Sequence, residues 1–511
     1  MRKLILTLAV VSIAVFAALG CGNDNKAASG AAELAPAGSV MYGEATLKPE
    51  GDQKAAIDAI LAKFPGGGQA GEQLKKLIEQ GLRDSEAPIS YREDIEPWLG
   101  DQAAFFVTGQ MKNGSLDGGL FLLATDDEDK SRAAIEKAHE GKGQKKTYKD
   151  VEYVIFPKGD GGAAAVLDGY VLIGTEDALK AAIDTSKGGK PLSDDEDYGN
   201  AIDKAADERL GLIYVNSPEF LKAAQQGGTP LPGSFKQFFE QPFVATIDAD
   251  KDGVLVEANI PADLAKAFAF FGQGSDLVTE LPADSWLAMA QPDFGKLLDF
   301  YVDAFAGVVG GRDVVEQQFK AATGLDLQKD VLDWMGDFGV FVRGASVAEL
   351  DGALIIETND EAASGRLIDR LRTLASSQVD SGGRITPLSA PGGGEGFTLR
   401  SPDVPKPVHL FQRNGRVVVA YGDQAASDAI DAAEKLGDSA EYRDATQSLD
   451  GYDISFYLLM QPIFDLVDST GAASDAGWQK AKPYLEPLSA LVGGTSGDGD
   501  SLRSAVKLVV K

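Results

Sequence analysis

The sequence of 511 residues predicts an α+β fold of two tandem, duplicated domains, each a largely antiparallel sheet with helices packed on one face. Three observations predict it. Four short motifs occur twice in the same order, which indicates an internal repeat. Apolar strand-like segments follow one another through short turns, which favours antiparallel pairing. Apolar residues at 44% and charged residues at 25% are typical of a folded globular chain.

The duplication rests on motifs whose two copies keep their order along the chain. The copies are PAGS at 36–39 and PADS at 282–285, EPWLGD at 96–101 and LDWMGD at 332–337, DGGL at 117–120 and DGAL at 351–354, and DGYVLI at 168–173 and NGRVVV at 414–419. Their spacing is nearly constant, and loop insertions account for its drift. We therefore expect a first repeat at 34–261 and a second at 281–511.

The chain begins with a segment typical of a lipoprotein signal peptide. Arg2 and Lys3 precede an apolar run at 4–19 that is too short to be a stable membrane span, and ALGC at 18–21 fits a lipobox. Cys21 is the one cysteine of the chain. We expect a signal peptide at 1–20 and lipidation of Cys21. The alternative is an ordinary secretory signal that ends near a cysteine.

Lipidation would place the protein outside the cytoplasm, anchored to a bacterial membrane. Two acyl chains hold a protein on a bilayer for long times, whereas one short chain does not. The small and polar residues at the start of 21–33 predict a flexible tether. With a single cysteine, no disulfide within the chain is available, so both repeats must be stable through packing.

Each repeat is expected to run through the same elements: an opening strand, helices, two strands after the Trp-x-Gly-Asp corner, a capped helix, a hairpin, two helices, a strand and a closing hairpin. The strands or hairpins expected are 39–47, 103–107, 120–125, 210–215 and 244–260 in the first repeat, and 285–290, 338–342, 354–358, 454–459 and 494–510 in the second. Trp98 and Trp334 are each followed by a glycine and then an apolar strand, a pattern typical of a helix that ends and turns into the core. We therefore predict that both tryptophans are structural.

Local signals mark turns and helix starts within this pattern. Asp168-Gly169 and Asn414-Gly415 predict hairpin turns with positive φ at both turn positions. Helix starts are expected where a Ser or Thr is followed three residues later by Glu, the capping-box spacing. The three matches are Thr125 with Glu128, Thr358 with Glu361, and Ser193 with Glu196.

Residues 262–280 join the repeats and are too apolar for a free linker. Phe268, Phe270 and Phe271 cluster there, and we expect a helix packed between the repeats. The alternative is that these three phenylalanines form a binding site for an apolar ligand or a membrane contact.

One acidic run resembles a metal-binding loop. Asp248, Asp250 and Asp252 have the spacing of a calcium loop, but Asn259 stands where a bidentate glutamate is needed. The alternating apolar residues that follow favour a hairpin turn. A weak cation site at these three aspartates remains an alternative.

Enzymatic chemistry finds little support in the residues. The chain has two histidines, His139 and His409, which give no zinc ligand set, and no Gly-x-Ser-x-Gly turn offers a nucleophile. The glycines at 66–71 match the dinucleotide pattern without a βαβ unit. A net charge of −30 disfavours nucleic acid. We therefore expect no cofactor, no catalytic residues and no enzyme.

Most of the chain after the signal peptide resembles a known family, and the first repeat carries the motifs. The residues PAGSVMY at 36–42, GDQKAA at 51–56, KFPG at 63–66 and WLGD at 98–101 are similar to motifs of the bacterial domain-of-unknown-function family 3352. The resemblance implies an exported or membrane-tethered envelope protein and no activity. The second repeat lacks the Gly-Asp-Gln-Lys and Phe-Pro motifs.

Together these patterns predict a lipid-anchored envelope protein that binds or scaffolds rather than catalyses. Its expected partners are the membrane, through the N-terminal lipid, and another envelope protein. A carrier of an apolar or lipid ligand at the junction of the repeats is one alternative. A hydrolase with an unrecognised carboxylate site is the other.

Overall fold

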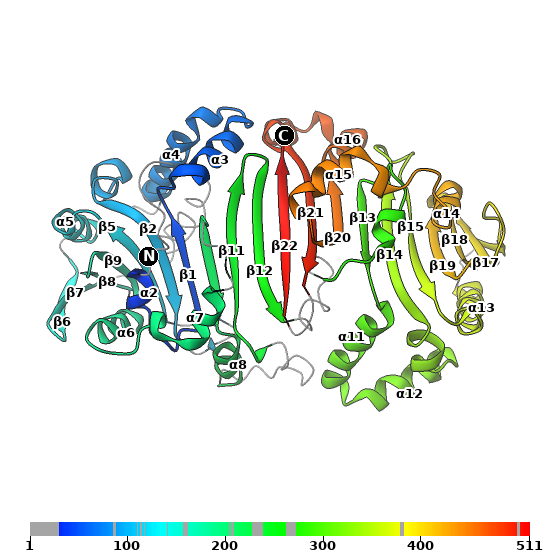
Figure 1. Ribbon diagram of the computed structural model, residues 1–511, viewed down its shortest axis with the longest axis horizontal. Helices are drawn as coiled ribbons and strands as arrows, with labels where there is room; N and C mark the ends of the chain where they lie inside the picture. The colour runs from blue at the N-terminus through cyan, green and yellow to red at the C-terminus, as the bar shows by residue number, and fades with distance from the viewer. Residues whose placement is uncertain are drawn as a thin grey trace. The chain divides into compact units, whose positions relative to one another are not determined.

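The computed structural model (Figure 1) describes most of the chain in two compact units. The described residues are 30–84, 88–109, 111–112, 115–116, 118–140, 142–156, 162–203, 205, 209–226, 239–261, 272–378, 383–497 and 501–511. The first unit holds the described residues up to Asn259, and the second holds those from Ile260. Within the described part, no helix is long and apolar enough to cross a membrane.

The first unit is built on an antiparallel sheet of ten strands. In spatial order these are β6 (Gln144–Tyr148), β7 (Val151–Ile155), β8 (Gly162–Leu167), β9 (Tyr170–Thr175), β5 (Gly119–Thr125), β2 (Leu99–Val107), β1 (Met41–Thr46), β10 (Gly211–Val215), β11 (Phe243–Asp250) and β12 (Gly253–Pro261). A two-stranded ribbon, β3 (Met111–Lys112) with β4 (Ser115–Leu116), lies apart from this sheet.

The second unit has a sheet with the same order of strands. They are β16 (Arg384–Pro387), β17 (Glu395–Ser401), β18 (Val404–Arg413), β19 (Arg416–Tyr421), β15 (Asp351–Thr358), β14 (Met335–Arg343), β13 (Leu287–Gln291), β20 (Asp453–Leu459), β21 (Leu488–Ser496) and β22 (Ser501–Val510). Every neighbouring pair in either sheet is antiparallel, so the predicted α+β class with an antiparallel sheet is confirmed.

Helices connect the strands in both units. In the first unit they are α2 (Gly30–Leu34), α3 (Gly51–Ala62), η1 (Gly67–Gln69), α4 (Ala70–Asp84), η2 (Tyr91–Ile95), α5 (Glu128–Ala138), α6 (Glu176–Ser186), η3 (Leu192–Asp194), α7 (Glu196–Ile202) and α8 (Ser217–Gln226). In the second they are α10 (Leu277–Glu280), α11 (Phe294–Val309), α12 (Arg312–Thr323), η5 (Gln328–Leu332), α13 (Glu361–Gln378), α14 (Asp423–Asp428), η6 (Leu436–Asp438), α15 (Ala440–Thr446), η7 (Gln447–Leu449), α16 (Gln461–Ser469), η8 (Ala472–Ser474) and α17 (Ala476–Leu485).

Helices cover both faces of the first unit's sheet, which corrects the expectation of one covered face. Strand β8 shows why, because all six of its residues are buried. Ala165 packs in a cluster with α2, α6 and α7, whereas its neighbour Val166 packs in a second cluster with α4 and α5. Successive side chains of a strand point to opposite faces, so the two clusters lie on opposite sides. The continuous apolar run GAAAVL carries this signal in the sequence.

The tryptophan corners are structural in both units, as predicted. Trp98 is 5% exposed and Trp334 is 1% exposed. Each indole N–H donates to the backbone carbonyl of the residue four positions earlier, Asp94 at 2.5 Å and Asp330 at 3.0 Å. A single π-helical turn, η2 or η5, supplies that carbonyl. The two corners thus have the same local structure.

The predicted hairpin turns are confirmed. Asp168 and Gly169 have φ of +47° and +79°, and Asn414 and Gly415 have φ of +53° and +72°. Both positions of such a turn lie in the left-handed region, which Asn, Asp and Gly tolerate. Each turn therefore forms where its dipeptide predicts it.

The expected capping boxes are wrong in detail, because the helices begin two residues later. Asp127 caps α5 by accepting from Lys130 N–H at 3.1 Å, and Asp360 caps α13 by accepting from Ala363 N–H at 2.9 Å. Asp195 in the same way caps α7 in place of Ser193.

The residues of the expected boxes have other roles. The hydroxyls of Thr125 and Thr358 accept from the backbone N–H of the two capping aspartates. The carboxylates of Glu128 and Glu361 accept from Gly169 and Gly415 N–H in the hairpin turns, at 3.3 and 3.1 Å.

Candidate functional site

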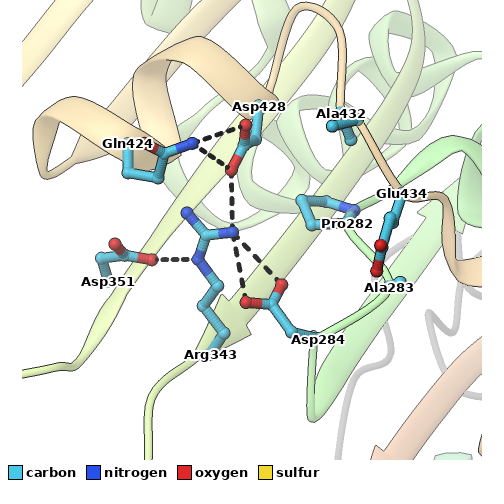
Figure 2. A pocket seen from close by; sticks show the side chains of 10 residues that line it. Pro282, Ala283, Asp284, Arg343, Asp351, Gln424, Asp428, Ala432 and Glu434 are labelled. Carbon is cyan, nitrogen blue, oxygen red and sulfur yellow. Dashed lines mark hydrogen bonds and ion pairs between the residues drawn. The ribbon is translucent and has the colours of Figure 1, made fainter.

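A polar pocket of about 500 Å³ lies within the second unit. Figure 2 shows its side chains around a central arginine. Its lining consists of Pro282, Ala283, Asp284, Arg343, Asp351, Gln424, Asp428, Ala432, Ala433 and Glu434. We call this the Arg343 pocket. Its volume lies within the range of small-molecule sites in proteins.

Three parts of the fold bring the charged side chains together. Arg343 ends β14 and Asp351 begins β15, and the antiparallel register places the two residues opposite each other. Asp428 is the last residue of α14, a helix that packs against β15 and β19. Asp284 lies in the turn that leads into β13, where Ser285 N–H donates to Pro282 O at 3.1 Å. The pocket therefore forms at one end of the central strands.

Arg343 is held by three carboxylates. Its Nε donates to Asp351 Oδ1 at 2.6 Å, and its Nη1 donates to Asp428 Oδ2 at 2.8 Å and to Asp284 Oδ1 at 3.2 Å. The arginine side chain is 10% exposed, those of Asp351 and Asp428 are 10% and 13% exposed, and that of Asp284 is 69% exposed. The guanidinium thus has two buried anchors and one carboxylate open to solvent.

The third guanidinium nitrogen has no such anchor. Nη2 of Arg343 is buried and has no hydrogen-bond acceptor among the described residues, and it is the nitrogen without a dashed line in Figure 2. A buried donor without an acceptor costs about 1–3 kcal/mol.

The electrostatics of the pocket favour cations over anions. Burial opposes the charge of Arg343, but hydrogen bonds to Asp351 and Asp428 outweigh it and raise the pKa of the guanidinium. In the lining, one positive charge faces the acidic side chains of Asp284, Asp351, Asp428 and Glu434. A second, Lys406 Nζ, lies 3.7 Å from Asp351 Oδ2. An anion would be repelled by this excess of carboxylates.

At three of the four corresponding places the first unit has an uncharged residue; the fourth, Asp117, matches Asp351 in sequence and lies outside the described residues. Val40 N–H donates to Val107 O in the first unit, and Trp286 N–H donates to Val342 O in the second. Val107 therefore corresponds to Val342, and Thr108 corresponds to Arg343. Gly38 stands before Ser39 where Asp284 stands before Ser285. Ala181 of α6 corresponds to Asp428 of α14, because both residues lie the same number of positions after the N-cap residue of their helix. The charged set is therefore a property of the second unit.

The residues that the sequence suggested as sites do not meet in this pocket. Cys21 and the three phenylalanines Phe268, Phe270 and Phe271 lie outside the described residues.

Asp248 and Asp250 lie on β11, and Asp252 lies in the turn to β12. Asp250 Oδ1 accepts from Asp252 N–H at 2.8 Å, so the expected hairpin turn is present. Across the described ranges, no group of three or more His, Cys, Asp or Glu side chains is arranged to hold a metal ion. The structure thus adds no support for the weak cation site.

His409 forms a chain of hydrogen bonds that resembles part of a catalytic triad. Its Nε2 is 2.8 Å from Asp423 Oδ1, and its Nδ1 is 3.0 Å from Thr398 Oγ1. Thr398 and His409 are both fully buried, so a substrate cannot reach that hydroxyl. We interpret this chain as structural, since a nucleophile must be accessible to the group it attacks.

Sequence reasoning did not single out the residues of the Arg343 pocket. Asp284 and Asp351 belong to the repeated motifs PADS and DGAL, which were interpreted as packing motifs. The available signal was a difference between the repeats: PADS has an aspartate where PAGS has Gly38. Arg343 and Asp428 are separated by 85 positions along the chain, and no local pattern connects them.

Comparison with known families identifies the family of this chain. The model of the family DUF3352, described as a protein of unknown function, matches residues 3–386 and confirms the resemblance. That range includes Asp284, Arg343 and Asp351 and ends before Asp428. No curated protein matches the chain.

Two solved structures match weakly. Crystal form IV of TP0453 has 7% identity and a TM-score of 0.25, over 45% of this chain and 80% of that one. Crystal form I of TP0453 has 9% identity and a TM-score of 0.18, over 78% and 95%. These scores are too low to establish a shared fold.

Proposed function

Because this chain belongs to the DUF3352 family of proteins of unknown function, we propose from its own residues that it is a lipid-anchored, extracytoplasmic protein that binds a small polar ligand in the Arg343 pocket. The lipobox at 18–21 supports the anchor. The polar cavity of about 500 Å³ around Arg343 is the observation that supports the ligand.

The geometry favours binding over catalysis. The carboxylates of Asp351 and Asp428 are engaged by the guanidinium at 2.6 and 2.8 Å. A carboxylate that pairs so closely with a permanent cation is a poor general base, because the cation stabilises its ionised form. The pocket therefore offers a fixed donor and fixed acceptors, which suit recognition.

We also propose that the two units arose by duplication. Their ten-stranded sheets have the same order, and their tryptophan corners and hairpin turns have the same hydrogen bonds. Independent chains rarely repeat such details. On this view the two units diverged at three places, where the second has Arg343, Asp284 and Asp428 and the first has Thr108, Gly38 and Ala181, while Asp351 matches Asp117 of the first.

One experiment tests the anchor and the ligand together. Wild-type protein and Cys21→Ser are expressed in the native host; we expect palmitate label and membrane fractionation for the wild type and neither for the variant. Native mass spectrometry of the Cys21→Ser protein should then show a bound mass. Adding Ala433→Trp, which fills the pocket from its exposed side, should remove that mass.

The matched control is Ala473→Trp, which adds the same bulk at an exposed position of the second unit outside the pocket. It should leave the bound mass in place. A bound mass that survives Ala433→Trp, or no bound mass in any variant, contradicts the proposed ligand site. Label that persists in Cys21→Ser contradicts the proposed anchor.

A further inference from the structure

We infer that helix α11 lies in the interface of a neutral phospholipid bilayer, through an apolar stripe on one of its faces. The stripe consists of Tyr301, Phe305 and Val309, which are 48%, 59% and 37% exposed. Residues four positions apart lie one above another on a helix, so these side chains form a continuous surface. The inference rests on the lipid anchor of the proposed function, which would hold the chain at the membrane.

The charged residues of α11 face its neighbour α12 instead of open solvent. Arg312 of α12 donates through Nη2 to Asp299 Oδ1 at 2.5 Å and through Nη1 to Asp303 Oδ1 at 2.7 Å. The side chains of the two aspartates are 37% and 47% exposed, so Phe305 is no less exposed than the charged residues of its own helix. A surface helix of a globular domain normally turns its apolar side to the core and its charged side to water. Helix α11 departs from this arrangement.

The start of α11 is packed against the second unit, which fixes the place of the stripe. The ring centroids of Phe294 and Phe338 are 4.5 Å apart. A Cβ added to Gly295 would lie 2.2 Å from Leu332 O, so this backbone approach needs glycine. Figure 1 shows α11 and α12 as neighbouring helices of the second unit. The stripe begins two turns after this contact, on a helix whose position is set by packing.

A bilayer fits this stripe better than a second copy of the chain or another protein. An aromatic side chain can bury about 150–250 Å², so three partly exposed side chains offer less than about 400 Å², whereas a stable protein interface needs about 800 Å² per partner. The net charge of −30 also opposes association of two copies. On a bilayer, the anchor keeps the stripe at a high effective concentration, so a small apolar area is sufficient.

The composition of α11 specifies neutral lipid. The stripe has no charged side chain, whereas binding to anionic headgroups depends on clusters of Lys and Arg. Lys296 is the one basic residue of α11, and its Nζ pairs with Asp293 Oδ2 at 2.8 Å. A helix with apolar residues on one face and charged residues on the other lies in the plane of the interface. We therefore expect α11 to lie along the bilayer surface, with the stripe among the upper parts of the acyl chains.

Quenching of tryptophan fluorescence by brominated lipid tests the inference. Lipidated wild type and Phe305→Trp are incorporated into phosphatidylcholine vesicles, with or without bromine on the acyl chains. The variant should show additional fluorescence over the wild type, and we expect brominated lipid to abolish most of that addition. Because Phe305 is exposed, the larger ring is accommodated without a change in the core.

Two further variants locate the contact on the stripe. Val347→Trp is the matched control, because Val347 is 51% exposed and follows the end of β14, whereas α11 packs against the start of that strand. Its added fluorescence should be the same in both kinds of vesicle. Val309→Asp, combined with Phe305→Trp, places a charge one turn further along the stripe and should remove the quenching.

Flotation with the vesicles, measured on the same samples, separates this inference from the proposed function. Protein that floats while the added fluorescence of Phe305→Trp is not quenched overturns the contact of α11 and leaves the anchor standing. Protein that neither floats nor carries palmitate label overturns the anchor and the inference together. Sedimentation velocity of Cys21→Ser that shows a dimer, lost when Phe305→Asp is added, identifies a second copy as the occupant and also overturns the inference.

Discussion

At Arg343, the cost of burying a charge is balanced by ion pairs with carboxylates. Removing a guanidinium from water is costly, and Asp351, Asp428 and Asp284 offset that cost by accepting from two of its nitrogens. The third nitrogen stays unsatisfied among the described residues. Replacing a buried ion pair by well-packed apolar residues is often neutral or stabilising, so this cluster is weak evidence for a role in stability.

Glu176 gives a prediction for acid stability at the same scale. Hydrogen bonds from Lys180 and Tyr153 lower the pKa of its carboxyl from the ordinary 4.5 to about 2. The folded-state pKa is thus below the unfolded one, so the stabilisation is complete above about pH 4.5 and is lost as the pH falls toward 2. We expect the Tm of the wild type to fall more steeply across this window than that of Glu176→Gln.

Thermal unfolding followed by circular dichroism between pH 7 and 2 measures the difference. Glu152→Gln is the control, because it removes an exposed glutamate of the same unit whose side chain is 66% exposed. Parallel pH curves for the wild type and Glu176→Gln would contradict the role of the carboxylate.

At the scale of elements, the capping-box spacing predicted the presence of the helices correctly but assigned the wrong residue as the N-cap. Thr358 and Glu361 have the capping-box spacing, yet Asp360 provides the cap and Glu361 bonds to the hairpin turn at Gly415. The turn is remote in sequence and is placed by the pairing of β15 with β19. Local rules assign the Glu361 carboxylate to the start of its own helix, whereas in the folded chain it accepts from the hairpin turn.

This assignment predicts unequal effects of two substitutions. Asp360→Ala should lower the free energy of unfolding by about 1 kcal/mol, because it leaves the first-turn N–H groups of Ala362 and Ala363 without their acceptor. Thr358→Val keeps the shape of the side chain and leaves that cap in place, so its effect should be smaller. Urea unfolding measures both, and equal losses would contradict the cap at Asp360.

For the whole molecule, charge and repeated architecture are the main features. The chain carries a net charge of −30 at pH 7 with an isoelectric point near 4.5. Like charges of this number repel one another in a compact state. Both units nevertheless fold around antiparallel sheets with the same strand order, without a disulfide to hold them.

Self-repulsion predicts a salt dependence. Raising NaCl from about 10 mM to about 150 mM shortens the Debye length from about 30 Å to about 8 Å and screens charges across each unit. We expect Tm at pH 7 to rise by several degrees. Differential scanning calorimetry in NaCl and in matched sucrose separates screening from general osmolyte effects. A Tm that is flat or falls with salt would contradict this expectation.

The sequence by itself determined the antiparallel α+β class, the hairpin turns at Asp168 and Asn414 and the structural role of Trp98 and Trp334. These features depend on contacts close along the chain or on backbone conformation, which residue type controls directly. Tertiary structure decided the caps and the Arg343 pocket, whereas the two covered faces of the first sheet have a signal in the apolar run of β8. Arg343, Asp351 and Asp428 meet because strand register and helix packing bring them together, and neither is encoded in a short segment.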